Sequence, residues 1–250
     1  MRSLRIIILT VAVALGLSLS AQTDPLLSQH YAVPSFYNPA AAGSTDLLRL
    51  RAGGRMQWVG IDNAPTTFLG AADMPLSLFG KKIGVGAVAM QESMGLYSTL
   101  SLGAQVAYKL RFAGGTLSVG LQLGMFDEGF KGSEVYLPDD DDFHQGADDA
   151  LPTTDVHGTA FDMGAGVFYS HKYFTAGISC THLMSPTLTL RTSSSSSSGV
   201  SRAADGAVSG EKVFQYEAAR TLYFQAEGNI PVKNTLFDIL PSVLVASDLT

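Results

Sequence analysis

Apolar side chains alternate with polar or small ones along most of the chain, with a period of two residues. In the segment 100–111, the even-numbered side chains from Leu100 to Leu110 are apolar, and the odd-numbered ones from Ser101 to Arg111 are small, polar or basic. Successive side chains of a β-strand point to opposite faces, so this pattern predicts a strand that is apolar on one face only. The same alternation recurs at 48–58, 117–126, 161–170, 174–181 and 222–230, and in a glycine-rich form at 83–90.

The length of the predicted strands favours a membrane barrel over a soluble β-sandwich, whose strands also alternate. The strands are about ten residues long, close to the 9–11 residues that cross a bilayer at a tilt. Strands of soluble proteins usually have about five to six residues. We predict nine strands, at 47–57, 66–74, 82–91, 99–111, 116–126, 159–169, 173–182, 212–230 and 235–247.

The predicted connections point the same way, because short and long ones segregate. Those after strands two, four, six and eight are short (75–81, 112–115, 170–172 and 231–234). Those after strands five and seven are long (127–158 and 183–211), and those after strands one and three are moderate. Outer-membrane barrels have short periplasmic turns and longer outside loops, whereas a sandwich has no reason to keep this parity. The sequence therefore predicts an all-β fold, an antiparallel transmembrane β-barrel of the outer membrane.

The strand count suggests that the barrel continues. Bacterial single-chain barrels have even numbers of strands, and many end on an aromatic residue. Nine strands is an odd number, and this sequence ends on Leu249-Thr250. We therefore expect at least nine or ten strands in this chain and a sequence that stops before the last strands of the barrel.

The first residues have the pattern of a secretory signal peptide. Arg2 and Arg5 precede the apolar run 6–19, and Ser20-Ala21 supplies the small residues of a cleavage site. The alternative, a membrane anchor, needs about 20 apolar residues. We predict a signal peptide at 1–21, an N-terminal periplasmic or plug segment at 22–46, and a barrel at 47–250 with long outside loops at 127–158 and 183–211.

Composition and charge agree with a membrane-embedded protein. Only 15% of the residues are charged, whereas soluble domains average about 25%. The net charge of −6 argues against a nucleic acid partner, which requires a basic surface. The lone Cys180 lies in a strand pattern, where it acts as a small packing residue.

The two long loops contain candidate metal ligands and a low-complexity tract. Clustered carboxylates suit Ca²⁺, but their spacing is not that of an EF-hand, so a solvated acidic loop is the favoured reading. His144 and His157 have no metal-type spacing either. The carboxylates are Asp139, Asp140, Asp141, Asp142, Asp148, Asp149 and Asp155, and the serine tract is Ser193 to Ser198. We predict no metal and no cofactor.

No catalytic motif is present in the sequence. It lacks G-x-S-x-G, H-E-x-x-H and a phosphate-binding loop. Ser170-His171 and Thr181-His182 could be proposed for an outer-membrane hydrolase, but such adjacencies are expected by chance in a serine-rich chain. We therefore predict that the protein is not an enzyme.

Five basic side chains share the predicted inward face: Arg49, Arg51, Arg55, Lys109 and Arg111. They could line a pore, or they could pair with interior carboxylates such as Asp162 and Glu227. The arginine fork matches a carboxylate well, so structural pairing is the favoured reading.

Three N-terminal segments carry a family resemblance. Residues 24–43 read DPLLSQHYAVPSFYNPAAAG, residues 57–67 read QWVGIDNAPTT, and residues 81–86 read KKIGVG. They resemble the mature N-terminus, the Q-W-x-G-x-x-G-A-P-T-T segment and the start of the third strand of the PorP/SprF family of type IX secretion outer-membrane proteins, found in Bacteroidetes. His30, Ala41 and Asn63 depart from the family pattern. The rest of the chain matches by strand pattern only.

The resemblance implies a non-enzymatic outer-membrane component of the type IX secretion and gliding machinery, which helps to secrete or anchor large surface adhesins. It implies contact with outer membrane lipid, with periplasmic secretion-machine proteins and with a secreted adhesin. The alternative is a transport barrel, a porin or hydrophobic-solute channel. The candidate contact residues are those that match the family motifs: Asp24, Pro25, Ser28, Gln29, Tyr31, Asn38, Pro39, Gly43, Gln57, Trp58, Gly60, Pro65, Thr66 and Thr67.

The segment before the first strand has two readings. Pro25, Pro34 and Pro39 oppose regular strand structure. Tyr31, Phe36 and Tyr37 offer aromatic contacts either to a partner or to the barrel interior. The sequence leaves these two readings open.

Overall fold

The computed structural model describes residues 25–78, 80–135, 154–192, 214–231 and 238–249. Several features predicted from the sequence lie outside these residues. They are the signal peptide, Asp24, the acidic residues Asp139 to Asp142, His144, Asp148, Asp149 and the serine tract Ser193 to Ser198.

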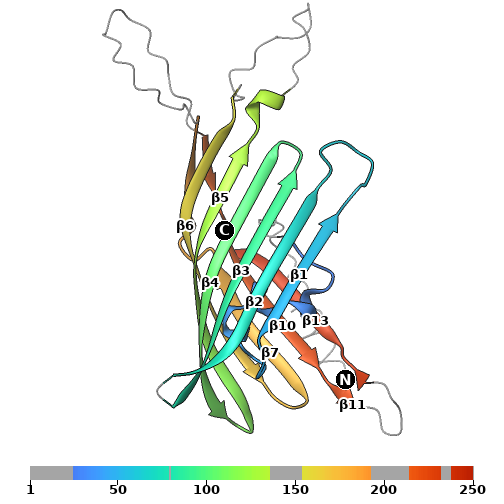
Figure 1. Ribbon diagram of the computed structural model, residues 1–250, viewed down its shortest axis with the longest axis vertical. Helices are drawn as coiled ribbons and strands as arrows, with labels where there is room; N and C mark the ends of the chain where they lie inside the picture. The colour runs from blue at the N-terminus through green and yellow to red at the C-terminus, as the bar shows by residue number, and fades with distance from the viewer. Residues whose placement is uncertain (1–24, 79, 136–153, 193–213, 232–237, 250) are drawn as a thin grey trace, which may run out of the picture.

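The described chain is an antiparallel β-sheet that curls into a half-barrel (Figure 1). The strands follow the order β1-β2-β3-β4-β5-β6-β7-β10-β13, so that β1 and β13 lie at its two edges. Their bounds are β1 Arg49–Met56, β2 Thr66–Leu78, β3 Lys81–Met94, β4 Tyr97–Phe112, β5 Gly115–Phe130, β6 Val156–Ser170, β7 Phe174–Thr181, β10 Arg220–Gly228 and β13 Ser242–Leu249. The predicted all-β antiparallel fold is confirmed.

Four short strands complete the structure. β8 (Thr187–Thr192) pairs with β6 and with β9 (Phe214–Glu217), beyond one end of the half-barrel. β11 (Ile230–Pro231) and β12 (Asp238–Ile239) form a separate pair at the other end. The predicted long loop 183–211 therefore contains a strand, and the predicted single strand 212–230 is divided into three. Ala218 interrupts it by donating its N–H to the carbonyl of Pro186, outside the main ladder.

Strands β2 to β6 are longer than predicted, at 13 to 16 residues each. The apolar alternation marks only their middle, and polar cross-strand pairs continue the ladder. Thr67 donates to Glu92, Thr99 to Glu128 and Thr159 to Asp127. The prediction of a moderate connection after the third strand is wrong for this reason, because β3 and β4 meet at a tight turn of Gly95 and Leu96.

The connections still divide between two ends. The described residues between β2 and β3, β4 and β5, and β6 and β7 (80, 113–114 and 171–173) lie at one end, which we name the turn end. The described residues that follow β1, β5 and β7 (57–65, 131–135 and 182–186) lie toward the opposite end, which we name the loop end. The tight turn at Gly95 lies at the loop end. The connection between β10 and β13, predicted to be short, has 13 residues, and its described part, with the β11–β12 pair, lies at the turn end. The predicted parity therefore holds for most connections and fails for these two.

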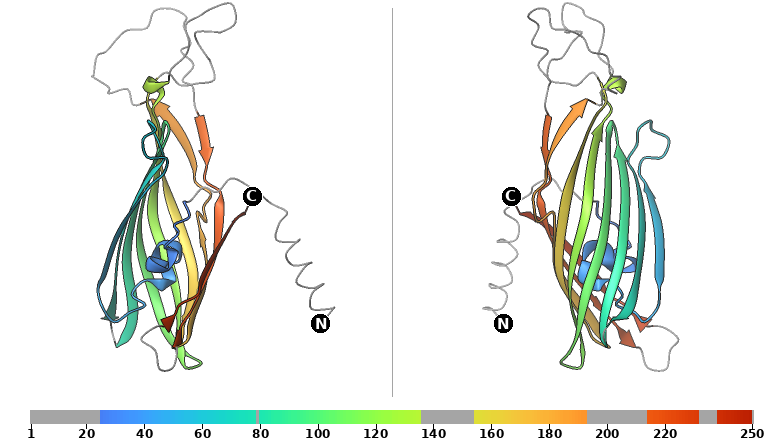
Figure 2. Two further views of the ribbon diagram at one scale, coloured as in Figure 1. Left: turned by 90° about the vertical axis from the view of Figure 1, so that its right-hand side faces the viewer. Right: turned by 60° about the vertical axis from the view of Figure 1, so that its left-hand side comes forward.

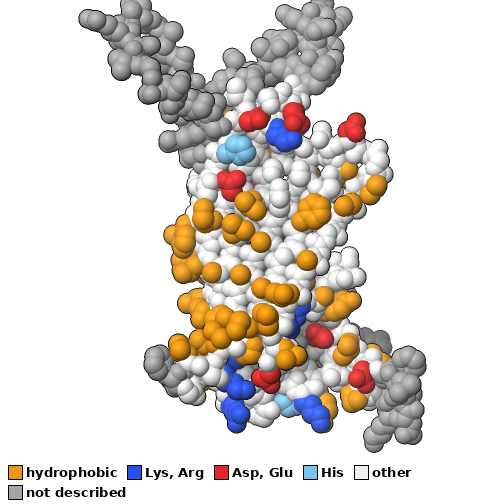
Figure 3. All heavy atoms as spheres, in the orientation of Figure 1, with side chains coloured by type: hydrophobic (Ala, Val, Ile, Leu, Met, Phe, Trp, Pro, Cys, Tyr) orange, Lys and Arg blue, Asp and Glu red, His pale blue; other side chains and the backbone are white. Residues whose placement is uncertain are grey.

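The two faces of the half-barrel differ in chemistry. The convex face carries exposed apolar side chains, and Figure 3 shows them over the middle of the face, with most charges near its ends. Across β4 and β5, for example, this face presents Leu100, Leu102, Val106, Leu121 and Leu123. Their neighbours in sequence face inward and are buried, among them Gly103, Gln105, Ala107, Gly120 and Gln122. The apolar residues of the predicted alternation therefore lie on the convex face, and the small or polar ones lie on the concave face.

Three short helices lie inside the curl, on the concave face (Figure 2). They are η1 (His30–Ala32), α2 (Pro34–Tyr37) and η2 (Pro39–Ala41), and a further turn of 3₁₀-helix, η3 (Gly132–Glu134), follows β5. None of the helices in the described residues has the length and apolar character needed to cross a membrane.

Candidate functional site

Residues 25–43, which we name the inner segment, contain the first group of motif residues. Proline begins both α2 and η2, where the missing N–H costs no hydrogen bond. Helices of three or four residues have no stability in isolation, so contacts with the sheet must hold them. The segment packs against β2 to β6, and η2 makes most of these contacts, on β4, β5 and β6.

Asn38 fixes the inner segment to the sheet. Its side chain is fully buried, and Oδ1 accepts a hydrogen bond from the Ala40 N–H at 2.9 Å, which caps η2. Nδ2 donates to the carbonyls of Val167 on β6, at 3.1 Å, and Ile178 on β7, at 3.4 Å. One amide thus orders the helix and joins it to two strands more than a hundred positions away in sequence.

Glycines on the concave face make room for this contact. A Cβ atom at Gly120 would overlap the backbone of Ala40, and one at Gly84 would overlap the carbonyl of Ala42. A Cβ atom at Gly177 would lie 2.6 Å from Nδ2 of Asn38. The small residues of the N-P-A-A-A-G motif therefore lie on a matching floor of glycines, which we name the glycine seat: Gly84, Gly120, Gly166 and Gly177.

The aromatic residues of the inner segment differ in their surroundings: some pack against the barrel interior, and some are free to contact a partner. Tyr37 is 1% exposed, lies 5.3 Å from the ring of Tyr223, and accepts the Leu27 N–H on its hydroxyl at 2.9 Å. Its carbonyl accepts a hydrogen bond from Ser179 Oγ at 2.6 Å. Tyr31, in contrast, is 53% exposed. The structure therefore packs Tyr37 inside the curl and leaves Tyr31 open to solvent on the same side.

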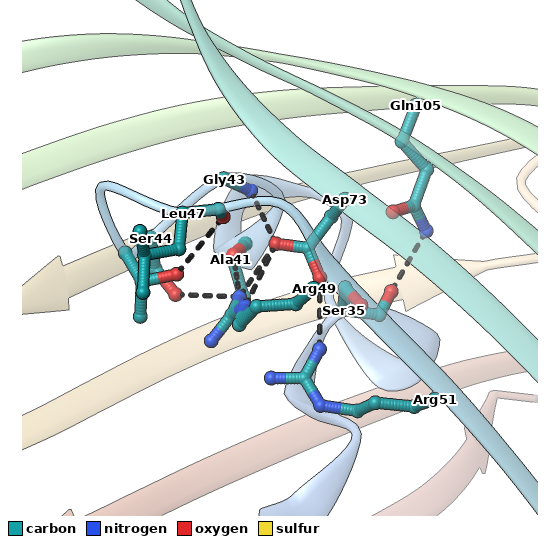
Figure 4. A network of polar contacts seen from close by, with 10 residues as sticks. Ser35, Ala41, Gly43, Ser44, Leu47, Arg49, Arg51, Asp73 and Gln105 are labelled. Carbon is teal, nitrogen blue, oxygen red and sulfur yellow. Dashed lines mark hydrogen bonds and ion pairs between the residues drawn. The ribbon is translucent and has the colours of Figure 1, made fainter.

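A buried carboxylate, Asp73 on β2, ties the inner segment to the edge of the sheet (Figure 4). Its Oδ2 accepts from Arg49 Nη2 at 2.6 Å and from the Gly43 N–H at 2.8 Å, and its Oδ1 accepts from Arg51 Nη1 at 2.8 Å. Two guanidinium groups and one amide offset the cost of burying the charge. Gly43 reaches this position with φ of +61°, a conformation that favours glycine.

Asp73 corrects the predicted pairing of the arginines. Arg49 and Arg51 do face inward as predicted and do form ion pairs, but with Asp73 rather than with Asp162 or Glu227. Asp162 instead lies 3.1 Å from Nδ1 of His182. The alternation in β2 could have predicted this partner, because Asp73 lies on the same odd-numbered face of the strand as the buried Thr67 and Ala71.

The second group of motif residues lies at the loop end, in the connection between β1 and β2. The Gln57 N–H donates to the Pro65 carbonyl at 2.9 Å and closes this loop. Trp58, with φ of 50°, is 69% exposed, and Gly60 is exposed as well. Pro65 and Thr67 are buried, and Thr66 is half-buried. The matched motifs therefore form two separate sites, one inside the curl and one at the loop end.

The remaining motif residues are at the start of the inner segment. Pro25 is buried, and its carbonyl accepts a long hydrogen bond from the Tyr37 hydroxyl, at 3.5 Å. Ser28 and Gln29 are exposed.

At the loop end, the carboxyl group of Asp155 is held by hydrogen bonds from Ser133. Asp155 accepts hydrogen bonds from the Ser133 N–H at 3.1 Å and from Ser133 Oγ at 2.7 Å, and these hold the pKa of its carboxyl below its usual range. The neighbouring Lys131 donates to Glu134 at 2.9 Å, which raises the pKa of the lysine.

The pair Ser170-His171 and the pair Thr181-His182 lie at different places in the structure and do not form one site. Ser170 and His171 lie at the turn end, where β6 stops, whereas Thr181 and His182 lie at the loop end of β7. Cys180, half-buried on β7, is a free thiol. Within the described parts of the chain, no three His, Cys, Asp or Glu side chains lie close enough to hold a metal ion.

A scan against protein families identifies the chain. The family model described as type IX secretion system membrane protein PorP/SprF matches residues 19–249, which is nearly the whole sequence. No curated protein and no solved structure gives a significant match. The match extends the resemblance of the three N-terminal segments over the strands that follow them. This chain belongs to the PorP/SprF family of type IX secretion system membrane proteins.

Proposed function

We propose that this protein is a non-enzymatic outer-membrane component of the type IX secretion and gliding machinery, which helps to secrete or anchor large surface adhesins. The observation that carries the proposal is the family match over residues 19–249, combined with a curled antiparallel sheet whose convex face is apolar. The protein reaches the outer membrane by its N-terminal signal peptide.

The convex face supports the position in the membrane. Exposed apolar patches of this extent are rare on soluble monomers, and they mark surfaces that bind lipid or protein. A sheet can enter a bilayer when its backbone groups pair with neighbouring strands, as they do along the full ladders from β2 to β6 and along the shorter ladders that join β6, β7 and β10. In this orientation the turn end faces the periplasm and the loop end faces the outside.

The inner segment supports a platform rather than a free channel. It occupies the concave face as a plug, fixed by Asn38, by the Asp73 cluster and by the glycine seat. We assign residues 22–46 to this plug and residues 47–250 to the barrel with its outside loops. A plugged sheet gives secreted proteins and periplasmic machine proteins a rigid surface to dock on.

The exposed part of the loop 57–65 is the best candidate for partner contact at the loop end. Trp58, Val59 and Ile61 are 69%, 82% and 64% exposed, and the closed backbone of the loop holds them outward. Aromatic and aliphatic side chains on a rigid support are typical anchors of protein interfaces. We assign them to contact with a secreted adhesin or with another protein of the machine.

Deletion of the gene in the native organism tests the proposal. We expect large surface proteins to be lost from the cell surface and gliding to fail, with both restored by the wild-type gene. Normal secretion and normal motility in the deletion strain would overturn the proposal. A steady open conductance of the purified protein in planar bilayers would favour the transport barrel instead.

A further inference from the structure

Two adjoining cavities open beside the inner segment at the turn end. One, of 550 Å³, lies between Ser44 and the ends of β3, β4 and β5, and the other, of 280 Å³, lies between the inner segment and β7, β10 and β13. Both are lined by Ser44, Phe168 and Ser170, so that they share a wall. We name the two together the mouth basin.

Cations predominate in the mouth basin. Lys82, Lys109 and Arg111 occupy the inward positions of β3 and β4 and line the larger cavity, and Arg49 lines the smaller one. Arg49 is already paired with Asp73.

Few carboxylates oppose these cations. Asp46 lies 3.5 Å from Lys82, with both side chains largely exposed, and Glu227 lines the smaller cavity. Lys109 and Arg111 have no ion pair among the described residues. The basin therefore has a surplus of positive charge.

Hydrogen-bond donors without a partner complete the lining. Gln225, 7% exposed, lines the smaller cavity, and its Nε2 has no hydrogen-bond partner within the described chain. Nε2 of His30 lines the same cavity and is buried without a partner there. A buried donor left unpaired costs free energy, so a bound acceptor would be favoured at this position. Ser170 and Thr175 line the same cavity.

We propose that the mouth basin binds an acidic peptide segment of a periplasmic protein, with its carboxylates at Lys82, Lys109 and Arg111 and its backbone carbonyls at Gln225. The proposed function enters this proposal at one point only: it places the turn end, and therefore the binding partner, in the periplasm. Carboxylates with lysine and arginine form charge-assisted hydrogen bonds, and peptide carbonyls accept from an amide nitrogen.

The faces of β3 and β4 argue for a soluble peptide rather than a lipid headgroup. The three cations lie on the concave face, whereas the outward positions of the same strand ends are apolar and aromatic, namely Tyr108, Leu110 and Phe112. Lys81 is the cation on the convex side, where its Nζ lies 5.4 Å from the ring of Tyr108. Lys81 also lines the rim of the larger cavity, so a headgroup at the membrane surface would meet Lys81 before the three inward cations.

Peptide binding to the full chain, purified from membranes in an uncharged detergent, tests the proposal. The probe is a fluorescent hexaglutamate peptide, followed by anisotropy at low ionic strength, with hexaglutamine and hexalysine peptides as comparisons. The K82Q/K109Q/R111Q variant should bind hexaglutamate about tenfold more weakly. The control K131Q/K172Q removes two cations that line neither cavity, and it should bind within about twofold of wild type.

A second variant keeps the test independent of folding. Gln225→Glu places a carboxylate where the unpaired amide stands, and it should weaken binding about fivefold while the circular dichroism spectrum stays that of the wild type. Equal losses in K82Q/K109Q/R111Q and in K131Q/K172Q would overturn the proposal, because they would show general charge attraction. So would equal affinity for hexaglutamine.

Two further probes separate the sources of negative charge. Inorganic phosphate should displace the peptide no better than chloride at equal ionic strength, and vesicles of phosphatidylglycerol should bind K82Q/K109Q/R111Q as well as wild type. Specific displacement by phosphate, or vesicle binding that requires these three cations, would overturn the assignment to a peptide. Since binding is measured on purified protein, normal secretion in the deletion strain would refute the proposed function and leave this inference standing.

Discussion

The two sites formed by the family motifs differ in what holds them. The second half of the inner segment is largely buried, and its motif residues have packing reasons: Asn38 bridges two strands, small residues meet the glycine seat, and Gly43 reaches Asp73. The loop 57–65 has a closed backbone, but Trp58 at its start is exposed. Packing therefore accounts for most of the first motif, whereas the described structure gives the exposed side chains of the second no packing role, which is why we propose partner contact for them.

Gly120→Val disrupts the contact between the inner segment and the glycine seat, and we expect it to lower the stability more than any of the other substitutions. The new Cβ overlaps the backbone of Ala40, so that the inner segment must move away from its seat. We expect the free energy of unfolding to fall by about 3 kcal/mol. Urea unfolding in detergent, with proteolysis of the inner segment as a second readout, measures it.

Gly70→Val is the matched control. A Cβ atom at Gly70 meets nothing within 4 Å, and its strand position faces outward. This variant should keep the wild-type free energy of unfolding within about 0.5 kcal/mol. If both variants lose the same stability, the glycine seat has no special role.

Asp73→Asn tests the ionic part of the buried site, with the next largest effect. It leaves two guanidinium groups, of Arg49 and Arg51, without the charge that they share. Because these arginine side chains are 18% and 20% exposed, water recovers part of the loss, and we expect about 2 kcal/mol of destabilisation. Urea unfolding of Asp46→Asn, whose pair with Lys82 is largely exposed, serves as the control and should show a change below about 0.5 kcal/mol.

Replacing Trp58, Val59 and Ile61 together by alanine sharpens the exposed side of the comparison. The free energy of unfolding should change by less than about 0.5 kcal/mol, because these side chains pack little. Surface display of large secreted proteins by a complemented deletion strain should fall at least about twofold. Display equal to that of Met94→Ala, an exposed residue at the same end, would remove this loop from partner contact.

Protonation of Asp155 gives the smallest expected effect. Its pKa is lowered in the folded state, so the stabilisation is present above the ordinary carboxyl pKa and is lost as the pH falls through the lower folded value. The bond to Ser133 should open only at a pH below the ordinary carboxyl pKa of 3.8. The protection of the Ser133 amide from hydrogen exchange, relative to its intrinsic rate at each pH, measures this, and Asp155→Asn should make that protection independent of pH in this range.

The alternating pattern predicted the faces of the strands better than it predicted their ends. Alternation assigned the inward face of β4 correctly at Lys109 and Arg111, because the face of a side chain depends only on its parity within a strand. Strand ends were placed less well, since the ladder at Glu92 and Thr99 continues through polar cross-strand pairs that carry no apolar signal. The positions of β8 and β9 depend on pairing with one another and with β6, which no local pattern encodes.

By itself the sequence determined the class of sheet, the chemistry of its two faces and the family, because these follow from side-chain alternation and from contiguous motifs. Only the tertiary structure decided that Asp73 is the partner of Arg49 and Arg51, since that depends on the register that sets Arg49 opposite Asp73. It alone decided that Asn38 reaches a carbonyl 129 positions away, and that the inward cations of β3 and β4 surround one basin. Contacts between distant segments are fixed when the sheet curls, and no window along the chain contains both partners.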